Sequence, residues 1–109
     1  MKYSFIIPVY NRPDEVDELL DSLTRLKMHD FEVIVVEDGS AVPCREVCEK
    51  YSQQLDIHYY MKPNSGPGQS RNYGVERAKG EYYLNKKYND YLCRVVLSGG
   101  GGKLKTRRR

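Results

Sequence analysis

The chain has 109 residues, which is room for one small domain and not for two. No apolar run in it is long enough to span a membrane, and no secretory leader is expected after Met1, so we expect a cytoplasmic protein. The net charge of +3 is divided unevenly: residues 1–84 carry 10 Lys or Arg and 14 Asp or Glu, whereas residues 85–109 carry 8 Lys or Arg and one acid.

The first part of the chain alternates between strand and helix patterns. Tyr3–Val9 is an almost continuous apolar run, which is typical of a strand buried on both faces. Pro13 suits the first position of a helix with an acidic first turn, and an apolar stripe follows at helical spacing: Val16, Leu19, Leu20, Leu23 and Leu26. Phe31–Glu37 is rich in Val and Ile and predicts a second buried strand.

The pattern continues with shorter elements. We expect in order a helix, a strand, a loop, a helix that Gly80 ends, and the start of a fourth strand: about Pro43–Gln53, Asp56–Met61, Lys62–Gly68, Gln69–Lys79 and Glu81–Leu84. Strands and helices that alternate with short connections predict an α/β fold with a parallel sheet. In such sheets ligands bind beyond the carboxyl ends of the strands.

The pattern breaks after residue 84, so residues 85–109 form an atypical polar and basic tail. Leu92–Leu97 is the one stretch here that suits a short strand, and we expect residues 98–109 to be disordered. A basic segment on an acidic body is typical of an arm that contacts nucleic acid or an anionic membrane. The alternative is that the tail is foreign to this fold, for example the product of a frameshift.

The cysteines and histidines do not suggest a metal site. Cys44 and Cys48 are spaced by one helical turn, but no further pair at zinc-binding spacing completes a site with them or with Cys93. We interpret them as small apolar side chains in a reducing compartment. His29 and His58 have no nucleophile near them in sequence, and we interpret both as structural.

Candidate binding residues follow the first predicted strand. Pro8, Tyr10 and Asn11 lie at its carboxyl end, where a Tyr ring can stack on a flat base. The simpler alternative is that Tyr10 covers the core and Asn11 caps the next helix.

Glu37 and Asp38 end the second predicted strand. Gly39 permits a sharp turn there, so we expect the two carboxylates to form an exposed pair that accepts hydrogen bonds from a base or a ribose. The alternative is a solvated turn with Ser40 as a helix cap.

The most specific stretch is residues 64–74. Gly66 and Gly68 allow the backbone to approach a ligand, and the helix predicted from Gln69 directs its free N–H groups at that loop. Arg71 in the first turn is unfavourable for the helix dipole, and a bound phosphate would provide it with a partner. An ordinary turn with Arg71 on the surface is the alternative. The stretch is not a Walker A loop, because no Gly-Lys-Ser/Thr follows.

Together these three motifs resemble the nucleotide-sugar-binding half of family 2 glycosyltransferases, over residues 3 to about 84. The resemblance implies a three-layer, Rossmann-like half of a GT-A fold, with residues 1–84 as a partial nucleotide-sugar-binding domain. It implies that Pro8, Tyr10 and Asp38 contact the base, that Arg71 lies near base and phosphates, and that Glu37 and Gly68 line the pocket.

The resemblance also implies a metal site that this chain lacks. In the family, Gly-Glu-Tyr leads into a strand that ends in Asp-x-Asp, which holds Mg²⁺ or Mn²⁺ against the diphosphate. Here residues 80–82 are Gly-Glu-Tyr, but Lys86 and Lys87 stand where acids are expected, and we do not identify Asn89 or Asp90 as a substitute. The family's catalytic base and acceptor-binding half are missing as well, so we identify no catalytic residue.

We therefore expect a domain that binds a nucleotide diphosphate sugar, similar to a UDP-sugar, for transfer to an acceptor hydroxyl. We expect it to be inactive alone, with donor sugar and acceptor unidentified. One alternative is a non-catalytic module whose tail contacts nucleic acid or anionic membrane, which would allow peripheral association with the inner membrane surface. Another is a partner chain that supplies the missing carboxylates. A sheet that ends after its fourth strand also exposes an edge, which predicts self-association unless Leu92–Leu97 covers it.

Overall fold

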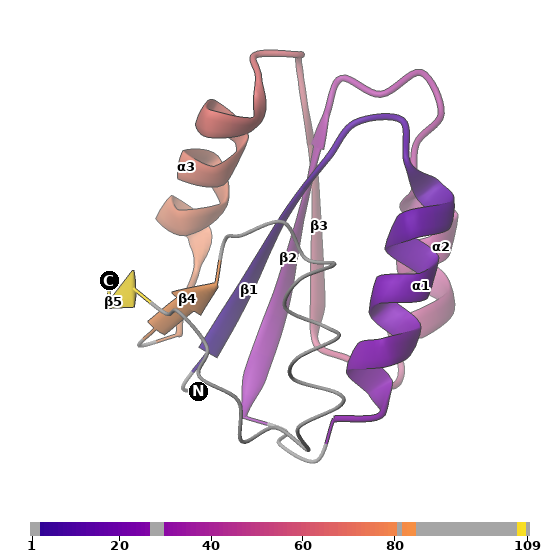
Figure 1. Ribbon diagram of the computed structural model, residues 1–109, viewed down its shortest axis with the longest axis vertical. Coiled ribbons are helices and arrows are strands. Elements are labelled where there is room, and N and C mark those ends of the chain that lie inside the picture. Colours follow the sequence, from indigo (N-terminus) through magenta and orange to yellow (C-terminus); the bar gives the residue numbers. More distant parts are fainter. Residues whose placement is uncertain (1–2, 27–29, 81, 85–106, 109) are drawn as a thin grey trace.

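The computed structural model describes residues 3–26, 30–80, 82–84 and 107–108 (Figure 1). The expected strand at Leu92–Leu97 lies outside the described residues, as does most of the tail. The elements are β1 (Tyr3–Val9), α1 (Pro13–Thr24), β2 (Phe31–Asp38), α2 (Arg45–Tyr51), β3 (Ile57–Lys62), α3 (Pro67–Arg77), β4 (Tyr82–Leu84) and β5 (Arg107–Arg108). The alternating order of strand and helix predicted from the apolar runs is confirmed as far as β4.

The strands form a single sheet in the order β3-β2-β1-β4-β5. The first four are parallel, with Tyr3 of β1 opposite both Phe31 of β2 and Tyr82 of β4. The chain runs outward from β1 to β3 and then returns to place β4 on the other side of β1. The strand order therefore reverses between the neighbouring strands β1 and β4. Open α/β sheets bind ligands beyond the carboxyl ends of the strands at such a switch point.

The edge next to β4 is covered by a different segment from the one we predicted. In the described part of the chain, β5 pairs antiparallel with β4, with Arg107 opposite Tyr83 and Arg108 opposite Tyr82. These two residues belong to the segment 98–109 that we expected to be disordered. β3, at the other end of the sheet, pairs with β2 alone among the described strands.

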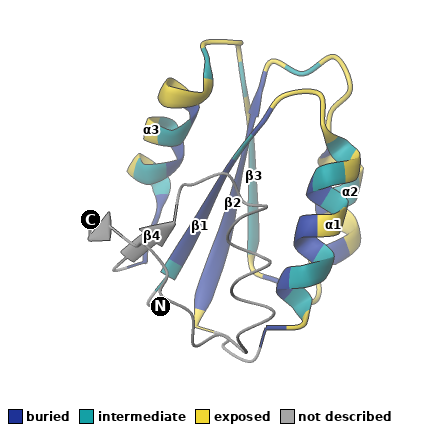
Figure 2. Cartoon of the chain, viewed as in Figure 1, coloured by how far each residue is buried: buried dark blue, intermediate teal, exposed yellow. Residues whose placement is uncertain are grey.

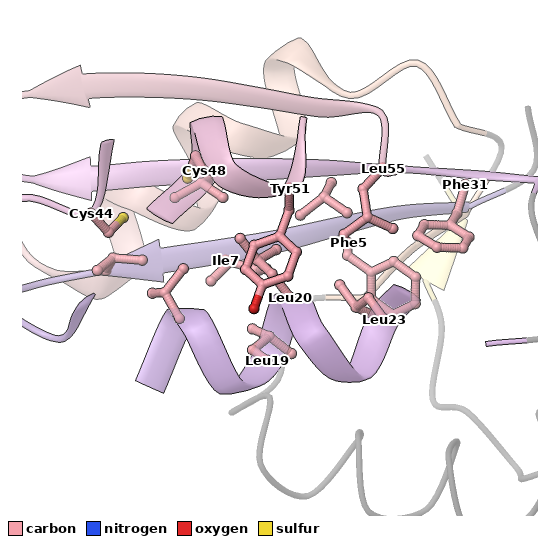
Figure 3. Packing of buried hydrophobic residues seen from close by; sticks show 14 of the residues in the cluster. Phe5, Ile7, Leu19, Leu20, Leu23, Phe31, Cys44, Cys48, Tyr51 and Leu55 are labelled. Atoms are coloured by element: carbon pink, nitrogen blue, oxygen red, sulfur yellow. The ribbon is translucent and has the colours of Figure 1, made fainter. Parts of the chain in front are cut away.

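Helices α1 and α2 pack on one face of the sheet and enclose the larger core (Figures 1 and 2). The odd-numbered residues of β1 and β2 point into this layer, because successive side chains of a strand alternate. Phe5 and Phe31 meet there edge to face, with ring centroids 5.2 Å apart. Figure 3 shows how the apolar stripe of α1 faces Cys48, Tyr51 and Leu55 across this core.

Helix α3 covers the opposite face over a much smaller apolar cluster. Its buried members are Ile6, Ile34, Val36 and Ala78. The helix approaches the strands closely at Gly74, where an added Cβ would lie 2.6 Å from Ile6 Cγ2 and 3.3 Å from Val36 Cγ2. The sheet thus lies between two helical layers, which confirms the predicted three-layer architecture.

Two of the predicted helices, α2 and α3, have different boundaries in the structure. Helix α3 begins at Pro67 and not at Gln69, because a proline suits the first helical position. It ends at Arg77, and Gly80 does not cap it: the backbone is already extended at Ala78. Gly80 is required for close packing, since an added Cβ would lie 2.5 Å from Ser4 Oγ and 2.8 Å from the Tyr3 carbonyl carbon. Helix α2 is shorter than predicted and covers Arg45–Tyr51.

Candidate functional site

The carboxyl ends of β1, β2 and β3 meet the N-terminus of α3 at one end of the sheet, the upper end in Figure 1. This is the end at which the sequence predicted a ligand. Of the predicted binding residues, Pro8, Glu37 and Asp38 lie in the last residues of β1 and β2, Tyr10 lies in the loop after β1, and Gly68 and Arg71 belong to α3.

Pro8 and Tyr10 mark the end of β1 and the loop after it. Pro8 is half-buried, whereas the Tyr10 side chain is one of the few large apolar groups left in solvent, with 52% of its surface exposed. The interpretation that Tyr10 covers the core is therefore wrong. An exposed ring at a strand end is free to stack on a planar ligand.

Asn11 joins the first loop to the second and does not cap α1. Its backbone N–H donates to Ser40 Oγ at 2.8 Å, and its Oδ1 accepts from the Val42 N–H at 3.0 Å. The residue has a positive φ of 52°, which Asn tolerates better than most residues. The N-cap position of α1 is Arg12, which has no side-chain capping bond.

Glu37 and Asp38 are not the exposed pair that we predicted: they are buried and point to opposite faces of the sheet. Glu37 faces the α1 and α2 layer, where its Oε1 accepts from Cys44 N–H at 2.7 Å and Tyr59 O–H at 2.8 Å. Its Oε2 accepts from Ser40 Oγ. Glu37 therefore holds the β2–α2 loop in place. The Ser40 hydroxyl donates to this carboxylate and does not cap α2.

The groups around Glu37 stay protonated at neutral pH. Burial, followed by the hydrogen bond to Glu37, raises the pKa of the Tyr59 hydroxyl, so that it remains a donor. The hydrogen bond with Cys48, together with burial and the nearby Glu37 charge, raises the pKa of the Cys44 thiol. Both cysteines are buried and free, in agreement with the interpretation as apolar filling.

Asp38 organises the β3–α3 loop from the other face. Its Oδ1 accepts from Lys62 Nζ at 2.9 Å and Ser65 N–H at 2.8 Å, and its Oδ2 accepts from Gly66 N–H at 3.0 Å. The Asn64 side chain donates to the Asp38 carbonyl oxygen. Burial opposes ionisation of this carboxyl group, but the donors from Lys62, Ser65 and Gly66 outweigh it and hold the Asp38 pKa below its usual value.

The sequence did not identify Lys62 as part of this site. Its side chain is 12% exposed and also donates to Ser65 Oγ and to the Pro63 carbonyl oxygen. Lys62 meets Asp38 because the two residues are register partners in β2 and β3. The register between two strands depends on the whole sheet, so nothing in the sequence around Lys62 indicated that it would meet Asp38.

The N-terminus of α3 has features that favour a nearby anion. Gly66 precedes it with φ of 98°, Pro67 is its first residue, and no acid lies in its first turn. Gly68 is exposed, and a Cβ added there would lie 3.9 Å from Arg71 Nη2, so the guanidinium group folds back over this first turn. Among the described residues Arg71 has no ion pair or hydrogen bond with another side chain.

The described residues at this end of the sheet do not form a metal site. Asp38 is the carboxylate nearest the α3 loop, and a lysine and two backbone donors occupy its oxygens. Within the described ranges, one group of potential ligands lies close enough to hold an ion: Glu32, Asp56 and His58, near the amino ends of β2 and β3. No described helix is long and apolar enough to cross a membrane.

The sequence profile of glycosyl transferase family 2 matches residues 4–85 of this chain. The chain belongs to that family. The match spans the sheet from β1 to β4 and includes each of the three strand-end motifs, so the predicted family membership is confirmed.

Named relatives include two transferases whose names give poly(ribitol-phosphate) as the substrate. Poly(ribitol-phosphate) beta-N-acetylglucosaminyltransferase TarS of Staphylococcus aureus is 37% identical over 101 residues, which cover 89% of this chain and 18% of TarS. Poly(ribitol-phosphate) beta-glucosyltransferase of Bacillus spizizenii is 36% identical over 102 residues, which cover 16% of its length. The chain therefore spans less than a fifth of these relatives.

Solved structures support the predicted GT-A fold. The crystal structure of S. aureus TarS 1–349 with UDP-GlcNAc matches with a TM-score of 0.73 and 39% identity, over 77% of this chain and 25% of that one. The UDP complex of the same protein matches with a TM-score of 0.75 over 87% of this chain and 32% of that one. A mannosyltransferase from Pyrobaculum calidifontis, solved with GDP-Man and Mn²⁺, shares the fold at 22% identity and a TM-score of 0.69.

Proposed function

We propose that this chain is the donor-binding part of a glycosyltransferase and binds the nucleotide of a UDP-sugar beyond the carboxyl ends of β1 and β2. The observation that carries this proposal is the unpaired charge of Arg71 within the described residues. Arg71 is a half-buried cation at the fifth residue of α3, and its guanidinium group folds back over the first turn of that helix. It has no ionic partner in the described part of the chain, and no acid lies in that first turn. A diphosphate would provide that partner and interact favourably with the helix dipole.

The roles of the other residues follow from their exposure and bonds. Tyr10 stacks on the base, with Pro8 beside it at the end of β1. Asp38 keeps one acceptor position on Oδ2 for a base N–H, while its other bonds hold the loop that carries Gly68. Glu37 shapes the pocket from behind, because its oxygens are engaged by Ser40, Cys44 and Tyr59.

The parent reaction would transfer a sugar from the nucleotide to an acceptor hydroxyl, with Mg²⁺ or Mn²⁺ bound to the diphosphate. The described residues around Arg71 do not suit that ion, since Lys62 already neutralises Asp38. We therefore propose nucleotide binding without turnover for this chain by itself. Solved relatives with UDP-GlcNAc and UDP support the choice of uracil nucleotide.

The test is isothermal titration of the chain with UDP and with uridine. We expect UDP to bind more tightly than uridine, and Arg71→Ala to weaken UDP by about tenfold or more, the usual loss for a hydrogen bond to a charged group. Arg25→Ala removes the same charge from the end of α1 and should leave UDP affinity unchanged. Equal binding of UDP by the chain and by its Arg71→Ala variant would contradict the proposal.

The uneven distribution of charge along the chain favours a second candidate function, that of a non-catalytic module whose basic tail contacts nucleic acid or anionic lipid. The tail carries a net charge of +7 against −4 for residues 1–84. This candidate predicts salt-sensitive binding to DNA, RNA or anionic vesicles that is lost on deletion of residues 98–109. Unlike UDP binding, that interaction would not respond to Arg71→Ala.

A further inference from the structure

Glu32 is a buried carboxylate in a position that suits an apolar residue. It is the second residue of β2, on the same face as Ile34 and Val36, and is 1% exposed. Its Oε2 accepts from Ser4 Oγ at 2.6 Å and from the Lys79 N–H. A carboxylate removed from water costs several kcal/mol unless both oxygens are compensated.

The second oxygen is not compensated by a hydrogen bond in the described part of the chain. Glu32 Oε1 faces His58 Nε2 at 3.5 Å, which is beyond a normal hydrogen bond. The same nitrogen lies 3.0 Å from Asp56 Oδ1. A ring nitrogen carries at most one hydrogen, so it can serve only one of the two carboxylates well. Because Asp56 Oδ1 is the closer acceptor, it would accept the hydrogen of His58 Nε2, and Glu32 Oε1 would have no donor.

We propose that Glu32 Oε1, Asp56 Oδ1 and His58 Nε2 bind a divalent transition-metal ion of the Zn²⁺ type. Each residue offers one ligand atom, and these atoms all lie within 4.8 Å of one another. Ligands at 2.0–2.1 Å in a tetrahedral site are about 3.3 Å apart, between the two distances that separate His58 from the carboxylates. One neutral imidazole and two carboxylates would balance the charge of the ion.

The surroundings of the three ligands suit a metal. Ser4 and the Lys79 N–H fix Glu32 through its other oxygen, which is how buried groups behind a metal orient a ligand. The side chains of His58 and Asp56 are 37% and 50% exposed, which leaves a path for the ion and a fourth position for water.

The ion would join β2 to β3 at the amino ends of the strands. Within the described part of the chain β3 pairs with β2 alone, so a metal bridge there would secure an edge strand of the sheet. The nucleotide site lies at the carboxyl ends of the same strands, and the metal site does not depend on the proposed nucleotide binding.

The experiment is titration of the metal-free chain with ZnCl₂, followed by calorimetry and by thermal unfolding. We expect one ion per chain and a rise in Tm that saturates with zinc, because an ion that binds only the folded state stabilises it. His58→Ala and Asp56→Asn, at half-exposed positions that should still fold, should each weaken binding at least tenfold. His29→Ala removes the chain's other histidine and should bind zinc as the parent does.

Co²⁺ in place of Zn²⁺ identifies the ligands. Ligation by nitrogen and oxygen gives weak visible bands alone, whereas ligation by Cys44 or Cys48 would add strong near-ultraviolet absorption from sulfur. Strong sulfur bands would overturn the proposal. So would zinc affinity that is unchanged in His58→Ala, or the absence of any saturable stoichiometric binding.

Discussion

Asp38 and Lys62 are register partners in neighbouring strands, and their side chains meet at 2.9 Å with 6% and 12% of their surfaces exposed. This buried ion pair helps to fix the position of the β3–α3 loop, because Asp38 also accepts hydrogen bonds from the backbone N–H groups of Ser65 and Gly66. The relationship connects stability with the candidate site: the residue proposed to contact a base is the same residue that anchors the loop before Arg71.

Lys62→Met should destabilise the chain by about 3–5 kcal/mol, because it leaves the buried Asp38 carboxylate without its counter-ion. Urea unfolding would measure the change. Lys50→Met is the matched control: Lys50 pairs with Asp17 at 3.3 Å, but it is 60% exposed, and exposed pairs contribute only about 0–1 kcal/mol. Equal effects of the two substitutions would show that burial of the Asp38 pair has no energetic importance.

Asp38 should also make the stability pH-dependent in acid. Its pKa is lower in the folded chain than the ordinary value of about 3.9 expected when unfolded, so the folded state favours the ionised form. That contribution is complete above the unfolded pKa and is lost as the pH falls through the folded pKa. The difference in unfolding free energy between the parent and Asp38→Asn should therefore be constant from pH 7 to about 5 and shrink below about pH 4. A difference that stays constant down to pH 2 would contradict this.

Gly80→Ala should destabilise the chain by about 1–3 kcal/mol, the usual effect of forcing a methyl group into a packed site. The new Cβ would lie 2.5 Å from Ser4 Oγ, in a strand that cannot move away freely. Gly68→Ala is the opposite case. It lies in the first turn of α3, where an added Cβ would meet only Arg71 Nη2 at 3.9 Å, an ordinary contact, so alanine should stabilise the helix by about 0.5–1 kcal/mol. Thermal unfolding of both variants distinguishes the two positions.

Tyr10→Ala should weaken UDP binding by about 1–3 kcal/mol through loss of stacking, with little change in stability because the side chain is half-exposed. Tyr10→Phe keeps the ring and should retain most of the affinity. Titration calorimetry with UDP measures both. If the phenylalanine variant loses as much affinity as the alanine variant, the hydroxyl group and not the ring is the binding group.

The sequence predicted the strands and helices well where apolar runs were long. Tyr3–Val9 and Phe31–Asp38 are buried on both faces, and such strands leave a continuous apolar signature that needs no tertiary information. The prediction for Gly80 failed because a glycine after a helix can serve either as a helix cap or as a site of close packing. Only the three-dimensional contact with Ser4 shows that close packing is the reason here.

The site was predictable only in part. The positions of Tyr10 and Asp38 at strand ends, and of Arg71 near the start of α3, followed from the order of elements. The separation of Glu37 from Asp38 required knowing that both faces of β2 are covered. Lys62 and the cluster of Glu32 with Asp56 and His58 depend on the register of β3 against β2. Residues on different strands become neighbours through that register, and no local pattern in the chain reports it.

The thin apolar layer beneath α3 has a consequence for motion. The cluster beneath this helix has four buried apolar residues, with the partly buried Tyr60, Tyr73 and Val75 packed against them. The core shared by α1 and α2 is larger, so α3 should detach from the sheet at a smaller free-energy cost than the other helices. In hydrogen exchange, the amides of α3 should then be the first helical amides to lose protection. A diphosphate bound at the N-terminus of α3 would hold that helix down, so saturation with UDP should slow exchange in α3 more than in α1. The helix that we propose to bind the phosphates would then also be the helix that bound nucleotide stabilises most.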